Sequence, residues 1–407
     1  MKITLITFFL SALFYISSPK AVLSDVFSTS RITEDSLTIK IPFPLKLGAV
    51  SDTYINEKRV KIDSFYNKNI NSPYYSGSFI VAKNGRIIYE DYKGYANVKT
   101  GTKIDAATPI HLASISKVLT ATAILRLVQQ DNITLDQKVT DWLPKFPYKS
   151  TTIRTLLNHR SGLPHYANFP ALMKKSWNRK KVLTNQEVYE ILAQKKLKLL
   201  SANDTRFDYC NTNYVILALI IEKATGLNYR KAMQELIFKP LGMNNSYVFN
   251  FDTDKETASQ SYRGNTIFPW DQFDNLYGDK NIYSTPRDLV KFDLGTYSPE
   301  FINQELLQEA YFGYSAGNVK NAVKDYGLGM RMRFLPPTGE KMVYHNGWWH
   351  GNNTSFIPVK KDTVTVICLG NKYSNRPYAT LSMASSLFYK KETAIEKPLP
   401  PETECEE

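Results

Sequence analysis

Strand-like segments lie near both ends of this sequence, and a helical stretch separates them. Near the start, GSFIVAKNGRIIYEDYKGYA alternates apolar and polar residues around Asn84-Gly85, a dipeptide typical of tight hairpins. Near the end, KMVYHNG, NTSFIPVK and TVTVICLG have strand-like patterns with short breaks, and a helix candidate follows over 376–390. These patterns predict an α+β fold, in which an antiparallel sheet is built from both ends of the chain and helices pack on it.

The middle of the chain, about 166–283, is predicted to form an inserted, mostly helical lobe. Its segments NYVILALIIEKATG and YRKAMQELIFKPLG have apolar residues at helical spacing. Similar spacing over 50–66 predicts a first helix, which with a polar leader makes up residues 25–70. We expect the main domain, which includes the lobe, to span 71–390. The Pro- and Glu-rich end, 391–407, is predicted to be disordered.

The first residues, MKITLITFFLSALFYISSPKAVLS, have the layout of an export signal. One early lysine precedes an apolar run from Ile3 to Ile16, and small and polar residues follow. Because that run is short for a membrane span, we expect residues 1–24 to be removed and the mature protein to be periplasmic or secreted, with no stable membrane span. The alternative is that the segment is kept as a membrane anchor.

The chain has 407 residues and a formal net charge of +13, but its lysines and arginines are scattered. Such scattering is typical of a solvated surface, and we expect no nucleic-acid partner for an exported chain, although weak attraction to anionic cell-envelope polymers remains open. The three cysteines are Cys210, Cys368 and Cys405, and an odd number argues against a disulfide framework.

The segment HLASISKVLTATAILRL places Ser114 and Lys117 three residues apart where an apolar helix is predicted to begin. Residues at this spacing face the same way, with Cβ atoms about 5–6 Å apart. A serine hydroxyl becomes a good nucleophile when a base takes its proton, and a desolvated lysine can be that base. The alternative is a serine N-cap beside a solvent-facing lysine. Alone the pattern is weak, since it occurs again at Ser17 and Lys20.

Further motifs follow in a set order: TIRTLLNHRSGLPHY, FDYCNTNYVILALIIEKATG, KPLGM, STPRDLVKF, YGLGM and YHNG. From about Gly77 to Tyr389 the sequence resembles the serine β-lactamase-like family, which includes class C β-lactamases, DD-peptidases and related esterases. That family has three motifs, S-x-x-K, Y-x-N, and K-T-G or H-x-G. The residues that match them here are Ser114 and Lys117, Tyr209 and Asn211, and His345 and Gly347.

The resemblance implies a role for each matched residue. Ser114 would attack an acyl carbon, Lys117 and Tyr209 would share its proton and pass it to the leaving group, and Asn211 would hold Lys117 and substrate through hydrogen bonds. The backbone N–H groups of Ser114 and Trp348 would bind the developing oxyanion.

The third motif departs from the β-lactamase pattern. A lysine and a hydroxyl residue are usual there and can engage a β-lactam carboxylate, whereas this chain has His345 and Asn346, followed by Gly347 at the substrate edge. A histidine is mostly neutral near pH 7, so a fixed positive charge is missing and efficient β-lactam hydrolysis is doubtful. The segment YGDKNIYSTPRDL also lacks the family's usual Gly-Gly pair.

Other reactive residues are weaker candidates. His159 matches a stretch that is usually structural in the family, and Cys210 is expected to point into the core rather than act as a nucleophile. His345 and His350 do not have a usual metal-ligand spacing, and we expect neither a metal nor another cofactor.

The sequence therefore predicts an exported serine hydrolase that forms an acyl-enzyme on a small ester or peptide substrate, including peptides with D-residues. Two alternatives remain. One is a penicillin-binding sensor or scaffold that is acylated without efficient turnover, and the other is a true class C-like β-lactamase.

Overall fold

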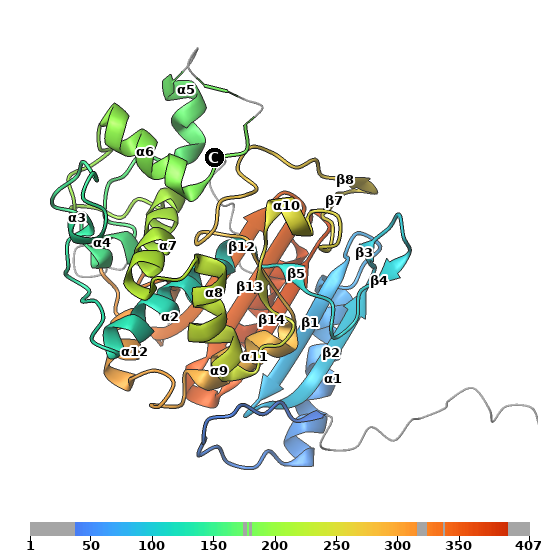
Figure 1. Cartoon of the computed structure of the whole chain (residues 1–407). Helices are drawn as coiled ribbons and strands as arrows, with labels where there is room; N and C mark the ends of the chain where they lie inside the picture. The colour runs from blue at the N-terminus through green and yellow to red at the C-terminus, as the bar shows by residue number, and fades with distance from the viewer. Residues whose placement is uncertain (1–36, 174–176, 179–180, 316–323, 337, 390–407) are drawn as a thin grey trace, which may run out of the picture. The chain divides into compact units, whose positions relative to one another are not determined.

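The large sheet joins strands from the beginning and the end of the chain, as predicted (Figure 1). The computed structural model describes residues 37–173, 177–178, 181–315, 324–336 and 338–389. Within these residues the sheet has seven antiparallel strands in the order β10-β11-β12-β13-β14-β1-β2. Their bounds are β1 Gly77–Lys83, β2 Arg86–Lys93, β10 Lys324–Tyr326, β11 Arg331–Leu335, β12 Glu340–Trp349, β13 Asn352–Val359 and β14 Val364–Gly370.

The strands β1 and β14 connect the two ends of the chain. Gly77 lies opposite Gly370 and Lys83 opposite Val364, so seven residues of each strand are paired. The β1–β2 hairpin turns at Asn84 and Gly85, whose φ angles are +50° and +80°. Asn and Gly tolerate this left-handed conformation, which explains why the dipeptide located the hairpin in the sequence.

One face of the sheet is covered by α1 (Asp52–Asn69) and the helical C-terminal segment. Ser51 caps α1 by accepting a hydrogen bond of 3.2 Å from the Tyr54 N–H, and the helix buries Ile55, Ile62 and Tyr66. The helix predicted over 376–390 is broken into a 3₁₀ turn Arg376–Tyr378, α13 Ala379–Ala384 and a π-helical turn Ser385–Tyr389.

The other face carries α2 (Ser116–Gln129) and α11 (Pro286–Gly295), and α7 (Asn211–Thr225) packs on α2. From Asn211 to Ile221 every residue of α7 is buried, which agrees with its almost continuous apolar sequence. The helix ends at Gly226, whose φ of +68° is the left-handed conformation that commonly caps the C-terminus of a helix. This helix therefore forms the centre of the larger core.

The rest of the described chain includes shorter α-helices and strands, joined by loops and single helical turns. The helices are α3 Val139–Trp142, α4 Ile153–Leu157, α5 Phe169–Met173, α6 Asn185–Lys195, α8 Tyr229–Met233, α9 Lys239–Leu241, α10 Phe251–Asp254 and α12 Gln304–Ala310. The strands are β3 Tyr95–Asn97, β4 Thr102–Lys103, β5 Ile110–His111, β6 Tyr247–Val248, β7 Tyr262–Arg263, β8 Thr266–Ile267 and β9 Ile282–Ser284. The described chain from Thr38 onward forms one compact unit, and the boundaries predicted for the domains stay a prediction.

Several predictions from the sequence concern residues outside the described part of the chain. They are the export signal over 1–24, residues 25–36 of the leader, the tail over 391–407 and Cys405. Among the helices that are described, none is long and apolar enough to cross a membrane.

Candidate active site

Ser114 and Lys117 lie within hydrogen-bond distance at the start of α2. Ser114 sits in a 3₁₀ turn, Ala113–Ile115, that leads directly into the helix. The Lys117 Nζ donates to Ser114 Oγ at 3.0 Å and to the Asp279 backbone oxygen at 2.9 Å. Lys117 is completely buried, so a cap beside a solvent-facing lysine is excluded. The amine is fixed against the hydroxyl, which is the geometry that activation of a serine requires.

The turn that carries Ser114 is held in a strained conformation. Ala113 has a φ of +50°, which is rare for a residue with a Cβ. Its N–H donates to His111 Nδ1 at 2.9 Å, and His111 Nε2 bonds Asn281 Oδ1 at 2.9 Å. Burial lowers the pKa of His111 to about 4, so the ring is neutral and can accept the Ala113 N–H. His111 is therefore a positioning residue that the sequence reading missed.

The backbone conformation of Asn281 partly explains how the segment YGDKNIYSTPRDL can lack the Gly-Gly pair that is usual in the family. Its φ is +71°, a left-handed conformation that glycine adopts freely and that asparagine tolerates. Besides its bond with His111, the Asn281 amide donates to the Asp274 backbone oxygen at 2.7 Å. The asparagine side chain thus links this segment to β5, the strand before Ser114.

Tyr209 lies beside Lys117, as the second motif predicted. The Lys117 Nζ is 5.0 Å from the centre of the Tyr209 ring, and the Arg331 guanidinium carbon is 4.8 Å from the same centre. The Tyr209 hydroxyl is buried and has no hydrogen-bond partner among the described residues. A buried polar atom without a partner is costly, so a substrate atom is a natural partner for it.

His159 holds the chain on both sides of Tyr209. Its backbone oxygen accepts from the Asp208 N–H at 2.8 Å, and its Nδ1 accepts from the Cys210 N–H at 3.1 Å. The ring centre lies 4.3 Å from that of Tyr209. The pKa of His159 is held well below 6.5, mainly by burial and secondly by the charge of Lys117. The ring therefore stays neutral. These contacts give His159 a positioning role.

Asn211 begins α7, and its side-chain oxygen is buried without a hydrogen-bond partner in the described chain. Cys210, between the two motif residues, points into the core as predicted, where its thiol donates to the Leu163 oxygen at 3.3 Å. Burial raises the pKa of Cys210 to about 12, which keeps the thiol protonated and unreactive.

His345 in β12 uses both ring nitrogens in hydrogen bonds. Its Nδ1 donates to the Asn346 oxygen at 2.6 Å, and its Nε2 accepts from the Tyr326 hydroxyl at 3.1 Å. Burial, and then the charges of Arg331 and Lys117, hold the pKa of His345 well below 6.5. The histidine is therefore neutral and fixes Tyr326, whose ring centre is 6.1 Å from that of Tyr209.

Asn346 and Gly347 face opposite sides of the sheet because side chains alternate along β12. A Cβ added to Gly347 would lie 2.9 Å from the Ser114 nitrogen and 2.6 Å from the Leu112 oxygen, so only glycine fits against Ser114. Asn346 pairs with Ser355, whose hydroxyl accepts from Thr380 of α13 on the other face. The structure therefore does not bring the Asn346 side chain to Ser114.

The free edge of β12 runs along the site. From His345 to Trp349 the strand pairs with β13, whereas β11 pairs only with Glu340 to Tyr344, and no other described strand covers the remaining edge. Trp348 is 40% exposed at this edge. An open strand edge offers backbone donors and acceptors to an extended substrate.

A second buried lysine lies behind the site. Lys280 Nζ donates to the Tyr166 hydroxyl at 2.8 Å and is 3.3 Å from Asp279 Oδ2, while its charge lies 4.4 Å from the Trp349 ring centre. Burial lowers the pKa of Lys280, and Asp279 opposes this effect. Because the Asp279 backbone oxygen also accepts from Lys117, this cluster adjoins the Lys117 amine.

One group near the site could hold a metal ion by geometry. Asp271, Asp274 and His350 place one ligand atom each within 4.8 Å of one another. Asp274 accepts from Trp349 Nε1 at 2.7 Å and lies 2.9 Å from His350 Nε2, and these bonds account for the cluster without an ion.

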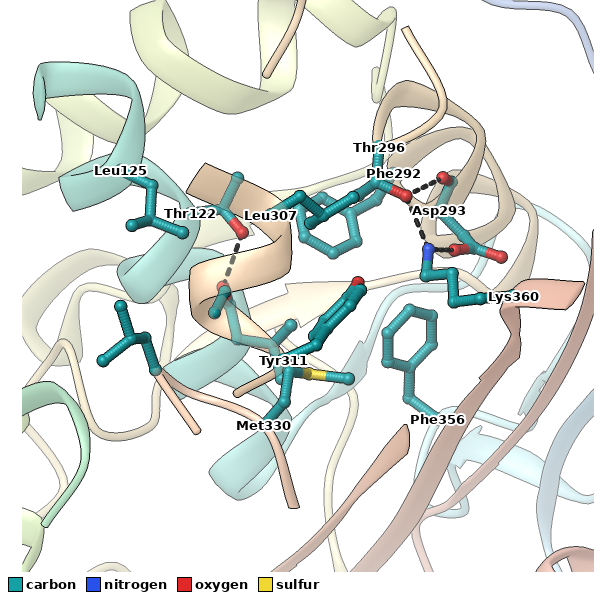
Figure 2. A pocket seen from close by; sticks show the side chains of 13 residues that line it. Thr122, Leu125, Phe292, Asp293, Thr296, Leu307, Tyr311, Met330, Phe356 and Lys360 are labelled. Atoms are coloured by element: carbon teal, nitrogen blue, oxygen red, sulfur yellow. Dashed lines mark hydrogen bonds and ion pairs between the residues drawn. The ribbon is translucent and has the colours of Figure 1, made fainter. Parts of the chain in front are cut away.

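An internal cavity of about 20 Å³ lies elsewhere, between α2, α11, α12 and the sheet. Figure 2 shows the Lys360 ammonium directed at Asp293 and Thr296 in its wall. The space suits a water molecule, and none of the predicted site residues lines it. The cavity is therefore separate from the chemistry at Ser114.

The fold and the Ser114–Lys117 pair define a serine acyl-transferase or hydrolase of the penicillin-binding type. The family model described as Beta-lactamase matches residues 74–387, and the chain belongs to this family. It is 31% identical over 336 residues to penicillin-binding protein 4* of Bacillus subtilis, covering 77% of this chain and 72% of that protein.

Two further similar proteins share a lower identity with this chain. A D-aminopeptidase of Brucella anthropi is 26% identical over 282 residues, which cover 68% of this chain and 52% of that protein. The crystal structure of a penicillin-binding protein from Bacillus halodurans matches with a TM-score of 0.67 and 22% identity, covering 80% of this chain and 99% of that one. This last likeness supports the fold alone.

Proposed function

We propose that this protein is an exported serine hydrolase that forms an acyl-enzyme on a small ester or on a peptide, including peptides with D-residues. The observation that carries the proposal is the buried Lys117 amine, held 3.0 Å from Ser114 Oγ by the Asp279 backbone oxygen. No other role accounts as simply for a lysine buried against a serine hydroxyl.

The first half of the reaction forms the acyl-enzyme. Ser114 Oγ attacks the carbonyl carbon of the substrate while its proton passes to Lys117 and Tyr209. The backbone N–H groups of Ser114 and Trp348 stabilise the negative charge on the carbonyl oxygen. Lys117 and Tyr209 then return the proton to the leaving group. Water releases the acyl group by the same steps in reverse.

Both the site and the relatives support the proposed substrate class. Substrate lying along the free edge of β12 would meet Gly347 beside the nucleophile, and the Tyr209 hydroxyl and Asn211 oxygen would gain the partners that they lack. The D-aminopeptidase relative supports acyl groups with D-residues. Neutral His345 in the third motif argues against β-lactams as good substrates.

Export is the remaining part of the proposal. It is supported by the apolar run from Ile3 to Ile16 after one lysine, and by the small and polar residues that follow. Intact mass of the mature protein tests it. Loss of about the first 24 residues is expected, and a periplasmic or secreted protein that retains Met1 would contradict cleavage.

The activity is tested with a panel of p-nitrophenyl esters, D-alanyl peptides and nitrocefin, run beside Ser114→Ala. We expect short acyl esters or D-residue peptides to be turned over much faster than nitrocefin, and Ser114→Ala to be inactive with all of them. Nitrocefin turnover equal to that of the best ester would identify a β-lactamase instead. Stoichiometric acylation without turnover would identify a penicillin-binding sensor.

A further inference from the structure

Residues 278–282 lie along the turn that carries Ser114 and along the start of α2. The hydrogen bonds between them join Gly278 O to Thr120 Oγ1 at 2.6 Å, Asp279 O to Lys117 Nζ at 2.9 Å, Ile282 N to Ser116 Oγ at 3.1 Å and Ile282 O to the Leu112 N–H at 2.8 Å. Among the described residues, the Asp279 backbone oxygen is the only hydrogen-bond acceptor of Lys117 Nζ besides Ser114 Oγ. The position of the Asp279 peptide group therefore fixes the direction in which the Lys117 amine points.

The side chain of Asp279 is fixed by two buried donors. Its Oδ2 accepts from the Tyr166 hydroxyl at 2.7 Å and lies 3.3 Å from Lys280 Nζ, which also donates to the Tyr166 oxygen at 2.8 Å. All three residues are buried, and hydrogen bonds that involve a charged group are stronger away from water. Because a single CH₂ group joins the carboxylate to Cα, fixing the carboxylate restricts the orientation of the Asp279 peptide group.

Lys280 is itself held from two sides. Tyr166 begins a 3₁₀ turn before α5, whereas Trp349 ends β12, and the Lys280 ammonium lies 4.4 Å from the centre of the Trp349 ring. The Trp349 Nε1–H donates to Asp274 Oδ1 at 2.7 Å, so this ring is fixed as well. Lys280 therefore connects the chain before α5 with the strand that lies beside Ser114.

Stability alone does not explain the buried pair of Asp279 and Lys280. Moving charges out of water is costly, and replacing a buried ion pair with apolar residues of similar size is often neutral or stabilising. Burial lowers the pKa of Lys280, and the charge of Asp279 opposes this effect. The pair lies in YGDKNIYSTPRDL, the segment that departs from the usual sequence of the family. A role at the neighbouring Lys117 accounts for an ion pair at this place in the chain.

We propose that Lys280 and Tyr166 are positioning residues for acyl transfer. They fix the Asp279 side chain and thereby hold its backbone oxygen where it aligns the Lys117 amine with Ser114 Oγ. This inference rests on the proposed function, because it concerns the same nucleophile. In this role neither residue needs to touch the substrate, and both act through Asp279 and Lys117.

The test measures how fast a fluorophosphonate probe modifies Ser114, followed by intact mass. The reaction forms an Oγ–P bond, releases fluoride and passes the hydroxyl proton to Lys117, so it reports the activation of Ser114 without a known substrate. Lys280→Met keeps the length of the side chain but removes its charge and donors. It should lower the second-order rate constant by about 10- to 100-fold, the range expected when a catalytic group is slightly misplaced. Lys280→Arg keeps the charge and N–H donors and should retain more of the rate.

Two comparisons separate positioning from a general loss of packing. In a Lys117→Met background, Lys280→Met should cause almost no further loss, because a residue that acts through Lys117 then has nothing to align. The matched control is Lys360→Met, since Lys360 is also paired with a buried carboxylate, that of Asp293, and lies 4.4 Å from the centre of the Tyr297 ring. This control should lower stability as Lys280→Met does and leave the rate constant unchanged.

Tyr166→Phe is a milder variant that does not disturb the charges. It removes only the hydroxyl that bonds both Lys280 and Asp279, and it should lower the same rate constant by a smaller factor. Thermal unfolding shows which variants are folded. If Lys280→Met does not fold, the rate constant of Tyr166→Phe decides the question.

Three outcomes would overturn the inference while leaving the proposed function intact, because Ser114 of the wild type is still modified in each of them. The first is an unchanged rate constant in folded Lys280→Met or Tyr166→Phe. The second is an equal loss in Lys280→Met and Lys360→Met. The third is a full, independent loss from Lys280→Met in the Lys117→Met background. A wild type that the probe does not modify at Ser114 would instead overturn the proposed function itself.

Discussion

The interface between α1 and the sheet and the surroundings of Ser114 are both buried, but their polar groups differ in hydrogen bonding. Under α1, Tyr66 stacks on Phe79 with ring centres 4.9 Å apart, and its hydroxyl donates to Asp91. Around Ser114, the Tyr209 hydroxyl and the Asn211 oxygen are buried without partners in the described chain, and Ala113 is strained. The first region is satisfied and contributes stability. The second has polar atoms without hydrogen-bond partners and a strained turn, which are features typical of functional sites.

The largest effects should come from the site. Lys117→Met and Tyr209→Phe keep bulk but remove proton transfer, so each should lower kcat/KM by about 10² to 10⁴. Because the two residues act on one proton, the double variant should lose far less than the product of the single losses. Thermal unfolding should show all three variants to be folded. Losses that multiply in the double variant would show that the residues act independently.

Under α1 we expect the opposite result, a loss of stability without a loss of activity. Ile62→Ala removes a fully buried side chain and should lower the free energy of unfolding by about 2–5 kcal/mol, with kcat unchanged. Alanine suits a helix, so the loss reports packing alone. The matched control, Ile62→Val, should cost about 0.5–1.5 kcal/mol in urea unfolding. A large drop in kcat of the folded Ile62→Ala protein would show that the two regions are coupled.

A smaller effect links stability to pH through His111, which holds the turn at Ser114. Burial lowers its pKa from 6.5 to about 4, so below pH 6.5 the unfolded chain binds a proton that the folded one does not. Stability is therefore complete above pH 6.5 and falls as the pH drops towards 4, by about 3 kcal/mol for this residue. Urea unfolding between pH 7 and pH 4 should give a shallower slope for His111→Gln than for the wild type. Identical slopes would contradict this assignment.

Local patterns in the sequence were enough to predict five strands of the sheet, β1, β2, β12, β13 and β14, and the contact between Ser114 and Lys117. Asn84-Gly85 specified its hairpin because the turn needs two positive φ angles. The spacing of Ser114 and Lys117 gave their contact because both lie within one turn. The helix predicted over 376–390 is broken into α13 and a π-helical turn, and no comparable local pattern in the sequence indicated this break.

Contacts between distant residues could not be predicted in this way. Asp279 holds Lys117 across 162 residues of chain, and it does so through a backbone oxygen, which any residue type would provide. Arg331 looks like an ordinary strand residue, and only the placement of β11 on α2 brings it to Tyr209. Likewise, His111 gains its role from the strained turn that follows it.

The most direct test of the central claim is to identify the serine that becomes acylated. The protein is treated with a fluorophosphonate probe and digested, and the modified peptide is sequenced by mass spectrometry. We expect labelling at Ser114 alone, and no labelling in Ser114→Ala. Ser161 and Ser284 are buried and bonded to Asn213 and Ser246, so modification of either one, or undiminished labelling of Ser114→Ala, would contradict the account.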